Sequence, residues 1–178
     1  MMGQAGRATE SLLKAPSSIG SFRTMDLRDL ITPDGIIAAL KVKTKKQALQ
    51  DLSDRAAVLT GANPRRIFEA LLQRERLGST GVGRGIAIPH GKISDIKQIF
   101  TLFARLDEKV DFEAMDGEPV DLIFLLLAPE TAGADHLKAL ARISRLLRDP
   151  AAIEKLRGSK DRAALYSVLT EPLASHAA

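Results

Sequence analysis

The pattern of apolar positions predicts two neighbouring helices in the first half of the chain. Thr44 precedes a segment whose apolar side chains recur every three or four residues, and Gly61 follows it, so we expect a helix capped at both ends. Asn63 and Pro64 then supply a cap residue and a proline at the first helical position of a second helix. This second helix is predicted to end at Gly78.

Strands are predicted in the middle of the chain, where the apolar positions stop following helical spacing. A brief strand covers Ile86–Ile88, and longer strands cover Ile96–Leu106 and Val120–Leu127. Asp116 and Gly117 mark a turn between the two longer strands, so we expect this pair to be antiparallel.

A strongly amphipathic helix is predicted between Asp135 and Leu147, and two shorter helices are predicted after Pro150. The apolar side chains at helical spacing in the first of these helices are Leu137, Leu140, Ile143, Leu146 and Leu147. Strands that alternate with helices indicate an α/β fold, a single three-layer sandwich domain whose mixed β-sheet is flanked by helices on both faces. We expect this domain to span residues 25–172, with a disordered extension at 1–24 and a frayed C-terminus at 173–178.

Composition and charge exclude several classes of protein. The chain contains no cysteine, so a disulfide framework, a thiolate metal site and a cysteine nucleophile are excluded. No segment approaches the roughly 18 apolar residues of a membrane span, and the N-terminus does not resemble a secretory signal, so we expect a cytoplasmic protein without membrane insertion. The net charge is +4, but residues 1–24 carry half of it and aromatic residues are only 4% of the chain, so nucleic-acid binding is not expected.

Candidate chemistry is concentrated in the segment between Arg74 and Lys92. No acidic residue lies between Glu75 and Asp95, whereas glycines, hydroxyl side chains and cations are frequent there. Glycine allows backbone amides to turn toward an anion, and hydroxyl groups and cations add donors, which together suit a phosphoryl group. The predicted phosphoryl-binding loop comprises Ser79, Thr80, Gly81, Gly83 and Arg84.

This segment does not match the known nucleotide-binding loops. The Walker motif places four residues between its glycines and a hydroxyl residue after its lysine, whereas five residues separate Gly85 from Gly91 and Ile93 follows Lys92. The dinucleotide fingerprint needs a third glycine three positions after its second, and neither Gly83 nor Gly85 has one. A loop that serves a phosphoryl group bound to a residue is therefore favoured.

His90 is the candidate acceptor of that phosphoryl group. It follows the brief predicted strand and stands between Pro89, which stiffens the backbone, and Gly91, which leaves space beside the ring. A neutral imidazole is nucleophilic at one nitrogen when a partner holds the proton on the other. The alternative is a histidine that only caps a strand, and the surrounding glycine, hydroxyl and cationic residues favour the acceptor.

His136 is the second candidate. It directly follows Asp135 at the start of the amphipathic helix, where free amides and the helix dipole favour an anion. From there it could donate a hydrogen bond to a phosphoryl group on His90, and the alternative is a surface histidine in the first helical turn. His176, near the C-terminus, is expected to be inert.

Other chemistries fit the sequence less well. Three scattered histidines make a weak zinc site, and we expect neither a metal nor a cofactor. Ser79 lies in Gly-Ser-Thr-Gly, which is not the nucleophile elbow of a hydrolase. Asp111 and Glu113 are interpreted as solvated loop charges and not as the paired acids of a glycosidase.

The run from Gly78 to Lys92, GSTGVGRGIAIPHGK, closely resembles the phosphorylation-site signature of IIA proteins of the phosphoenolpyruvate-dependent phosphotransferase system. The likeness extends from about Met25 to Leu169. It is greatest with the nitrogen-regulatory branch, which is related to the fructose and mannitol IIA domains. One departure is Arg84, where members of this family commonly have asparagine, and the added charge could alter affinity for a phosphoryl donor.

The resemblance implies roles for individual residues and a mixed sheet flanked by helices. His90 would be phosphorylated by a small histidine phosphocarrier protein, and His136 would be the second active-site histidine. Arg74 would support the site, and Ser79 and Thr80 fall on the hydroxyl pair of the motif.

The predicted function is that of a phosphoryl carrier with a regulatory output of the nitrogen or potassium type, through phosphorylation-dependent binding to transporters or sensor kinases. One alternative is a sugar-uptake IIA subunit that passes the phosphoryl group to a fructose- or mannitol-type IIB. Another is a pure binding regulator whose docking is switched by phosphorylation, which is compatible with the first reading.

Overall fold

The computed structural model describes residues 25–172, and its central element is a six-stranded sheet. The predictions for residues 1–24 and 173–178, including His176, lie outside the described residues. The strands are β1 (Ile36–Leu40), β2 (Gly81–Gly83), β3 (Ile86–Ala87), β4 (His90–Ile93), β5 (Phe100–Val110) and β6 (Val120–Pro129). The helices are α1 (Lys45–Thr60), α2 (Pro64–Arg76), α3 (Ala134–Leu146), α4 (Pro150–Gly158) and α5 (Arg162–Thr170), with 3-10 turns η1 (Leu27–Asp29) and η2 (Pro33–Gly35).

The sheet is mixed, as predicted. Strands β5 and β6 pair antiparallel in its centre, with Leu102 opposite Leu125, which confirms the prediction from the turn at Asp116 and Gly117. Strand β1 pairs parallel with the outer side of β5. On the other side of β6, β3 and β4 follow one another and both run parallel to it.

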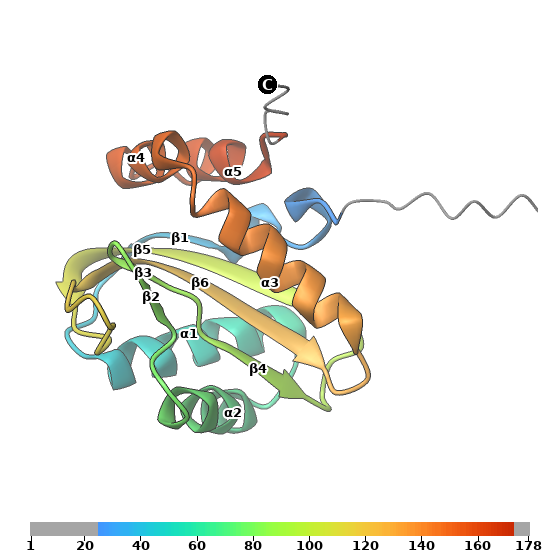
Figure 1. Cartoon of the computed structure of the whole chain (residues 1–178). Helices are drawn as coiled ribbons and strands as arrows, with labels where there is room; N and C mark the ends of the chain where they lie inside the picture. Colours follow the sequence, from blue (N-terminus) through green and yellow to red (C-terminus); the bar gives the residue numbers. More distant parts are fainter. Residues whose placement is uncertain (1–24, 173–178) are drawn as a thin grey trace, which may run out of the picture.

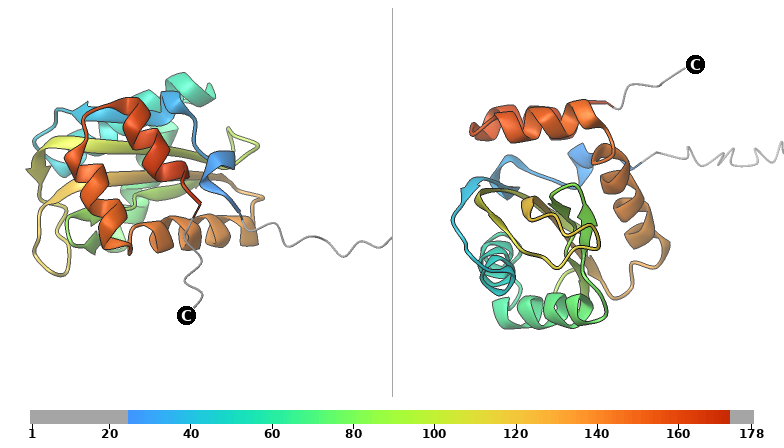
Figure 2. Two further views of the ribbon diagram at one scale, coloured as in Figure 1. Left: turned by 90° about the horizontal axis from the view of Figure 1, so that it is seen from above. Right: turned by 60° about the vertical axis from the view of Figure 1, so that its left-hand side comes forward.

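Helices cover both faces of the sheet, so the predicted three-layer sandwich is confirmed. Helices α1 and α2 lie on one face, and α3, α4 and α5 lie on the other (Figures 1 and 2). The side chains of β6 alternate between the two resulting cores, Leu125 facing α1 and α2 and Phe124 facing the other helices. Because both faces are buried, β6 is a continuous apolar run and not an alternating one.

The helix boundaries in the first half of the chain follow the capping signals. The Thr44 hydroxyl accepts a hydrogen bond from the Gln47 amide at the start of α1, and Gly61 ends the helix in the left-handed conformation with φ of 78°. The Asn63 side chain accepts from the amides of the first turn of α2. Among the described helices, none is long and apolar enough to cross a membrane.

Two predictions in the second half of the chain were wrong in detail. Strand β5 begins at Phe100 and not at Ile96, because the chain must reverse direction between β4 and β5 and the intervening residues form that reversal. Leu137 is 67% exposed, although it was assigned to the apolar stripe of its helix. The buried face of α3 instead contains His136, Ala139 and Ile143, and one residue along a helix turns the side chain by about 100°.

Candidate functional site

Both ring nitrogens of His90 have partners on neighbouring elements. Nδ1 lies 2.8 Å from the backbone oxygen of Ile88, two residues earlier in the chain. The side chain of Arg74, at the end of α2, donates from Nε to Nε2 of His90 over 3.1 Å. An arginine can only donate, so Nε2 is the acceptor and Nδ1 carries the hydrogen that binds the Ile88 oxygen. The ring is therefore held as the Nδ1–H tautomer, with a lone pair on Nε2.

Close packing between α2 and β4 brings Arg74 to the histidine. A side chain at Gly91 would meet the Cβ of Ala70 at 3.3 Å, so the two small residues allow the helix and the strand to approach. Arg74 lies one helical turn after Ala70, on the same face of α2, and is thereby placed beside His90. A second bond, from Nη1 to the Gly78 oxygen at 2.8 Å, fixes the guanidinium.

His136 lies beside His90, from the opposite layer of the fold. The two ring centroids are 5.7 Å apart and the rings are tilted by 45°. His136 is only 9% exposed, and its Nε2 has no hydrogen-bond partner among the described residues. A buried ring nitrogen without a partner costs free energy, so this group is available for a ligand that supplies one.

Both histidines are held toward the neutral form. The pKa of His90 lies below its usual value, mainly because the ring is partly buried. The hydrogen bond to the Ile88 oxygen raises the pKa, the positive charge of Arg74 lowers it, and the negative charge of Glu75 raises it. Burial also lowers the pKa of His136, and the nearby His90 and Lys92 lower it further. Neutral imidazoles are the nucleophilic form near pH 7.

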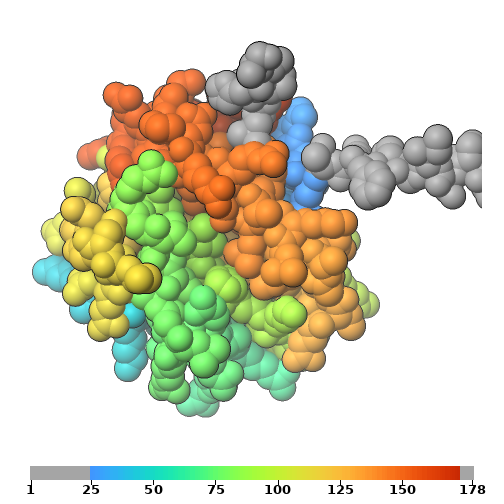
Figure 3. Space-filling model, in the orientation of Figure 1, coloured from blue at the N-terminus to red at the C-terminus, as the bar shows by residue number. Residues whose placement is uncertain are grey.

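The two histidines open into a surface cavity of about 670 Å³ between α2, β4 and the start of α3. The described residues that line it are Ala70, Gln73, Arg74, Arg76, Leu77, His90, Gly91, Lys92 and His136. None of these side chains is acidic and three are cationic, so the cavity suits an anion. In the space-filling view the segment that includes β4 reaches the surface between α2 and α3 (Figure 3).

The hydroxyl pair of the predicted loop does not face this cavity. Thr80 is buried and donates from its amide and its hydroxyl to Glu75, at 2.9 and 2.6 Å. The Ser79 hydroxyl donates to the Phe112 oxygen and accepts from the Gly81 amide. These donors are therefore committed to partners inside the protein, contrary to the expectation that they face a phosphoryl group.

Arg84 lies at the tip of the β2–β3 hairpin and does not line the histidine cavity. It occupies the two-residue turn with Gly85, and φ is positive at both positions, 55° and 78°. Its amide donates to Asp116 at 2.8 Å and its carbonyl accepts from Arg157. Together with these partners it lines a separate cavity that contains neither His90 nor His136. Arg84 and the preceding Gly83 are thus not brought to the predicted site.

Glu75 is a residue near the site that the sequence analysis missed. Its side chain is 3% exposed, and it accepts hydrogen bonds from Thr80 and from Lys45. An acidic side chain in the last turn of a helix is unfavourable for the helix dipole, and this was the signal that could have identified it.

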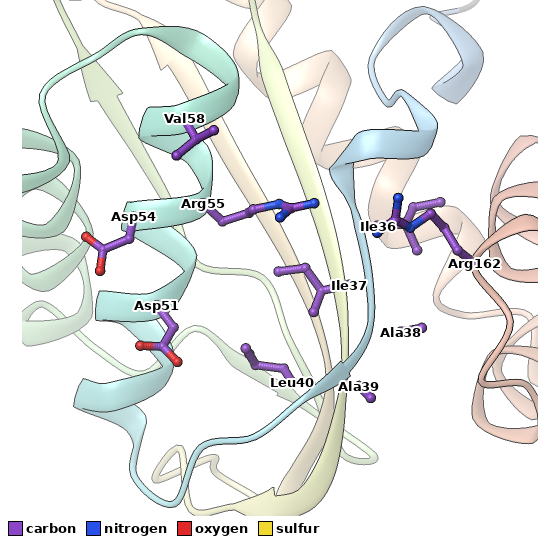
Figure 4. Close-up of a pocket in the computed structure, with 10 residues that line it drawn as sticks. All are labelled: Ile36, Ile37, Ala38, Ala39, Leu40, Asp51, Asp54, Arg55, Val58 and Arg162. Carbon is purple, nitrogen blue, oxygen red and sulfur yellow. The ribbon is translucent and has the colours of Figure 1, made fainter.

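A third cavity, of about 560 Å³, lies along the edge strand β1, away from the histidines. Arg55 points from α1 toward β1, and Arg162 approaches from the other side (Figure 4). No histidine lines this cavity. Within residues 25–172, no group of three or more histidine and acidic side chains is arranged to hold a metal ion.

The comparisons with known proteins agree with the resemblance seen in the sequence. Residues 29–171 match the family described as phosphoenolpyruvate-dependent sugar phosphotransferase system, EIIA 2. The chain is 63% identical over 153 residues to the nitrogen regulatory protein of Bradyrhizobium diazoefficiens, covering 86% of this chain and 100% of that protein. It is 38% identical over 151 residues to the fructose-specific EIIA component of Haloferax volcanii, covering 83% and 98% of the two chains.

Among solved structures, the nitrogen regulatory protein IIA-Ntr of Neisseria meningitidis is similar, with a TM-score of 0.77 and 33% identity over 81% of this chain and 99% of that chain. The fold, the matched residues and the relatives agree with one another. The chain therefore belongs to the EIIA 2 family of the phosphoenolpyruvate-dependent sugar phosphotransferase system, in its nitrogen-regulatory branch.

Proposed function

We propose that this IIA phosphocarrier accepts a phosphoryl group on Nε2 of His90 from a histidine phosphocarrier protein, with a regulatory output. The observation that carries the proposal is the fixed tautomer of His90, because the Ile88 oxygen holds the hydrogen on Nδ1 and leaves the lone pair on Nε2. His90 lines a cavity whose described side chains include three cations and no acidic group. Nucleophile and charge stabilisation are thus supplied by the same pocket.

In the proposed step the Nε2 lone pair attacks the phosphorus atom of a phosphohistidine on the donor. The bond between phosphorus and the donor nitrogen breaks, and its electron pair stays on the donor ring. His90 keeps the hydrogen on Nδ1 and so becomes a phosphorylated imidazolium, whose positive charge the Ile88 oxygen stabilises through the existing hydrogen bond. Arg74 leaves Nε2 and donates to the phosphoryl oxygens.

His136 would act on the same phosphoryl group from the other side. Its unpartnered Nε2 would donate a hydrogen bond to a phosphoryl oxygen, which recovers the free energy lost by burying it. His136 lies in the first turn of α3, and no side chain caps this end of the helix. The first amides of α3 therefore also favour the negative charge of a phosphoryl group.

Isotope labelling tests the acceptor. The protein is incubated with labelled phosphoenolpyruvate and the purified donor system, and the modified residue is mapped. His90→Ala is expected to abolish labelling, and persistent labelling of a folded His90→Ala variant would reject the assignment. His136→Ala is expected to slow transfer or weaken the phosphorylated form without loss of the fold, and unchanged kinetics would reduce His136 to a structural residue.

The regulatory output is favoured by the similarity to the Bradyrhizobium nitrogen regulatory protein. The expected partners are transporters or sensor kinases that bind one phosphorylation state. Pull-downs with wild-type protein, phosphorylated protein and His90→Ala would show whether partner choice follows phosphorylation. The same partner set in all three samples would contradict a regulatory switch.

A sugar-uptake function is the second candidate, because a fructose-specific EIIA component is 38% identical to this chain. In that case the phosphoryl group would pass from His90 to a fructose- or mannitol-type IIB. Transfer from the labelled protein to purified IIB, at a rate comparable with its acceptance from the donor, would establish this alternative in place of the regulatory one.

A further inference from the structure

Glu75 is a buried carboxylate in an unfavourable position. It lies in the last turn of α2, where the helix dipole opposes a negative charge, and it is only 6% exposed. Burying a charge costs free energy unless hydrogen bonds and a counter-charge compensate it. Three contacts do so: the amide and hydroxyl of Thr80, at 2.9 and 2.6 Å, and the ammonium of Lys45, at 3.5 Å.

These contacts continue directly to the histidine. The backbone oxygen of Thr80 accepts a hydrogen bond from the Ile88 amide at 2.9 Å. The Ile88 oxygen, on the same residue, accepts from Nδ1 of His90. The carboxylate therefore fixes Thr80, which fixes the short segment that carries the Nδ1 partner.

The last turn of α2 thus controls both nitrogens of the His90 ring. Arg74 binds Nε2 directly, and the next residue, Glu75, holds Nδ1 through two intervening residues. Neither Glu75 nor Thr80 lines the histidine cavity, so neither is placed to touch a phosphoryl group or its donor.

We propose that Glu75, neutralised by Lys45, is a positioning residue that holds His90 in the Nδ1–H tautomer and thereby aims Nε2 at the phosphoryl donor. The proposal rests on the proposed function, since it assigns a purpose to the tautomer in that reaction. It separates the residues that bind the phosphoryl group from those that prepare its acceptor.

The first measurement is the tautomer itself, which requires no donor. In ¹⁵N NMR spectra of the ring, wild-type His90 is expected to show hydrogen on Nδ1. Glu75→Ala is expected to add a measurable share of the Nε2–H tautomer, because the Ile88 oxygen is no longer held in place and only Arg74 still favours hydrogen on Nδ1. Glu75→Gln keeps the shape and the bond from the Thr80 amide, so it is expected to lie between the two.

The second measurement is phosphoryl transfer from the phosphorylated donor protein. Glu75→Ala is expected to lower kcat about tenfold, because a small misplacement of reacting groups is costly, while KM stays within twofold. Glu113→Gln is the matched control, since Glu113 is the exposed second partner of Lys45 and is expected to leave tautomer and kcat unchanged.

Thr80→Val gives a second route if Glu75→Ala does not fold. It removes only the hydroxyl donor and is expected to shift the tautomer in the same direction, whereas Thr80→Ser keeps the hydroxyl and is expected to show the wild-type tautomer. A folded Glu75→Ala or Thr80→Val protein with the wild-type tautomer and kcat would overturn the proposal. Failure of wild-type protein to accept the label would reject the proposed function, and the NMR spectra would still decide whether Glu75 positions the ring.

Discussion

Arg74 Nε lies 3.1 Å from Nε2 of His90, the nitrogen that we propose as the phosphoryl acceptor. The same guanidinium binds the Gly78 oxygen through Nη1, so the arginine stays in place when its bond to the ring is broken. One side chain can therefore protect the lone pair in the free protein and bind the phosphoryl oxygens after transfer. A planar guanidinium with several donors suits both tasks better than an ammonium does.

Replacing this arginine is expected to slow phosphoryl transfer strongly. Arg74→Ala should lower the single-turnover rate from the phosphorylated donor about 100-fold, because it removes a donor aimed at the developing charge. Arg74→Lys should recover part of this loss, since it keeps the charge but not the planar fork. Arg65 is an exposed cation on the same helix, so Arg65→Ala is the control and should leave the transfer rate unchanged. A rate for Arg74→Ala within twofold of wild type would contradict the assignment.

The two histidines should make the protein less stable in weak acid. Because the pKa values of His90 and His136 are lowered below the usual 6.5, the unfolded chain binds more protons than the folded one as the pH falls below that value. Their contribution is complete above about pH 6.5 and is lost as the pH falls through the lowered values. Urea unfolding between about pH 8 and pH 5 should show this loss, and His136→Gln should reduce it.

The acidic groups with lowered pKa values do not account for a loss of stability in this pH range. Asp26, Asp95 and Asp116 have pKa values below their usual 3.8, so the stability that they contribute is lost at lower pH than the histidine contribution. A free energy of unfolding that stays constant between about pH 7 and pH 5 would contradict the lowered histidine values.

The sequence predicted the fold well where the signals are local. The caps at Thr44 and Asn63 determine where α1 and α2 begin, because each cap satisfies amides only two or three residues away. The partners of His90 depend instead on how α2 packs against β4, which a single sequence does not encode locally. Glu75 looks like an ordinary helix-surface charge until Thr80 and Lys45 are seen around it.

For the predicted phosphoryl-binding loop, the sequence suggested site residues that the structure does not bring to the histidine cavity. Its glycines, hydroxyls and cations suggested that all of its donors meet one anion. In the structure the amide and hydroxyl of Thr80 donate to Glu75, and the backbone of Arg84 binds Asp116 and Arg157, so part of this segment takes part in internal hydrogen bonds and not in a binding site.

Exposed leucines beside the histidine cavity should contribute to docking of the donor protein. Leu77 lines the cavity and is 85% exposed, and Leu137 follows His136 and is 67% exposed. Apolar side chains around a polar centre are typical of protein interfaces. Leu77→Asp and Leu137→Asp should each raise KM for the phosphorylated donor about tenfold, the effect of losing about 1.4 kcal/mol of binding, with little change in kcat.

Val58→Asp is the control for this docking prediction. Val58 is 80% exposed but lines the cavity along β1, so its replacement should leave KM and kcat unchanged. If Val58→Asp raised KM as much as Leu77→Asp, the docking surface would not be centred on the histidines.

The hairpin turn at Arg84 should be a site where a substitution stabilises the protein. A two-residue turn with positive φ at both positions is the type I′ turn, which favours asparagine followed by glycine. Arg84 pays a steric cost of roughly 1 kcal/mol for its φ of 55°, which asparagine largely avoids. Arg84→Asn should therefore raise the free energy of unfolding by about 0.5–1 kcal/mol in urea titrations, whereas Arg84→Ala keeps the cost and should give no gain. Because Arg84 lies outside the histidine cavity, phosphoryl transfer should be unchanged in both variants, and a slower transfer in Arg84→Asn would instead place this arginine in the donor interface.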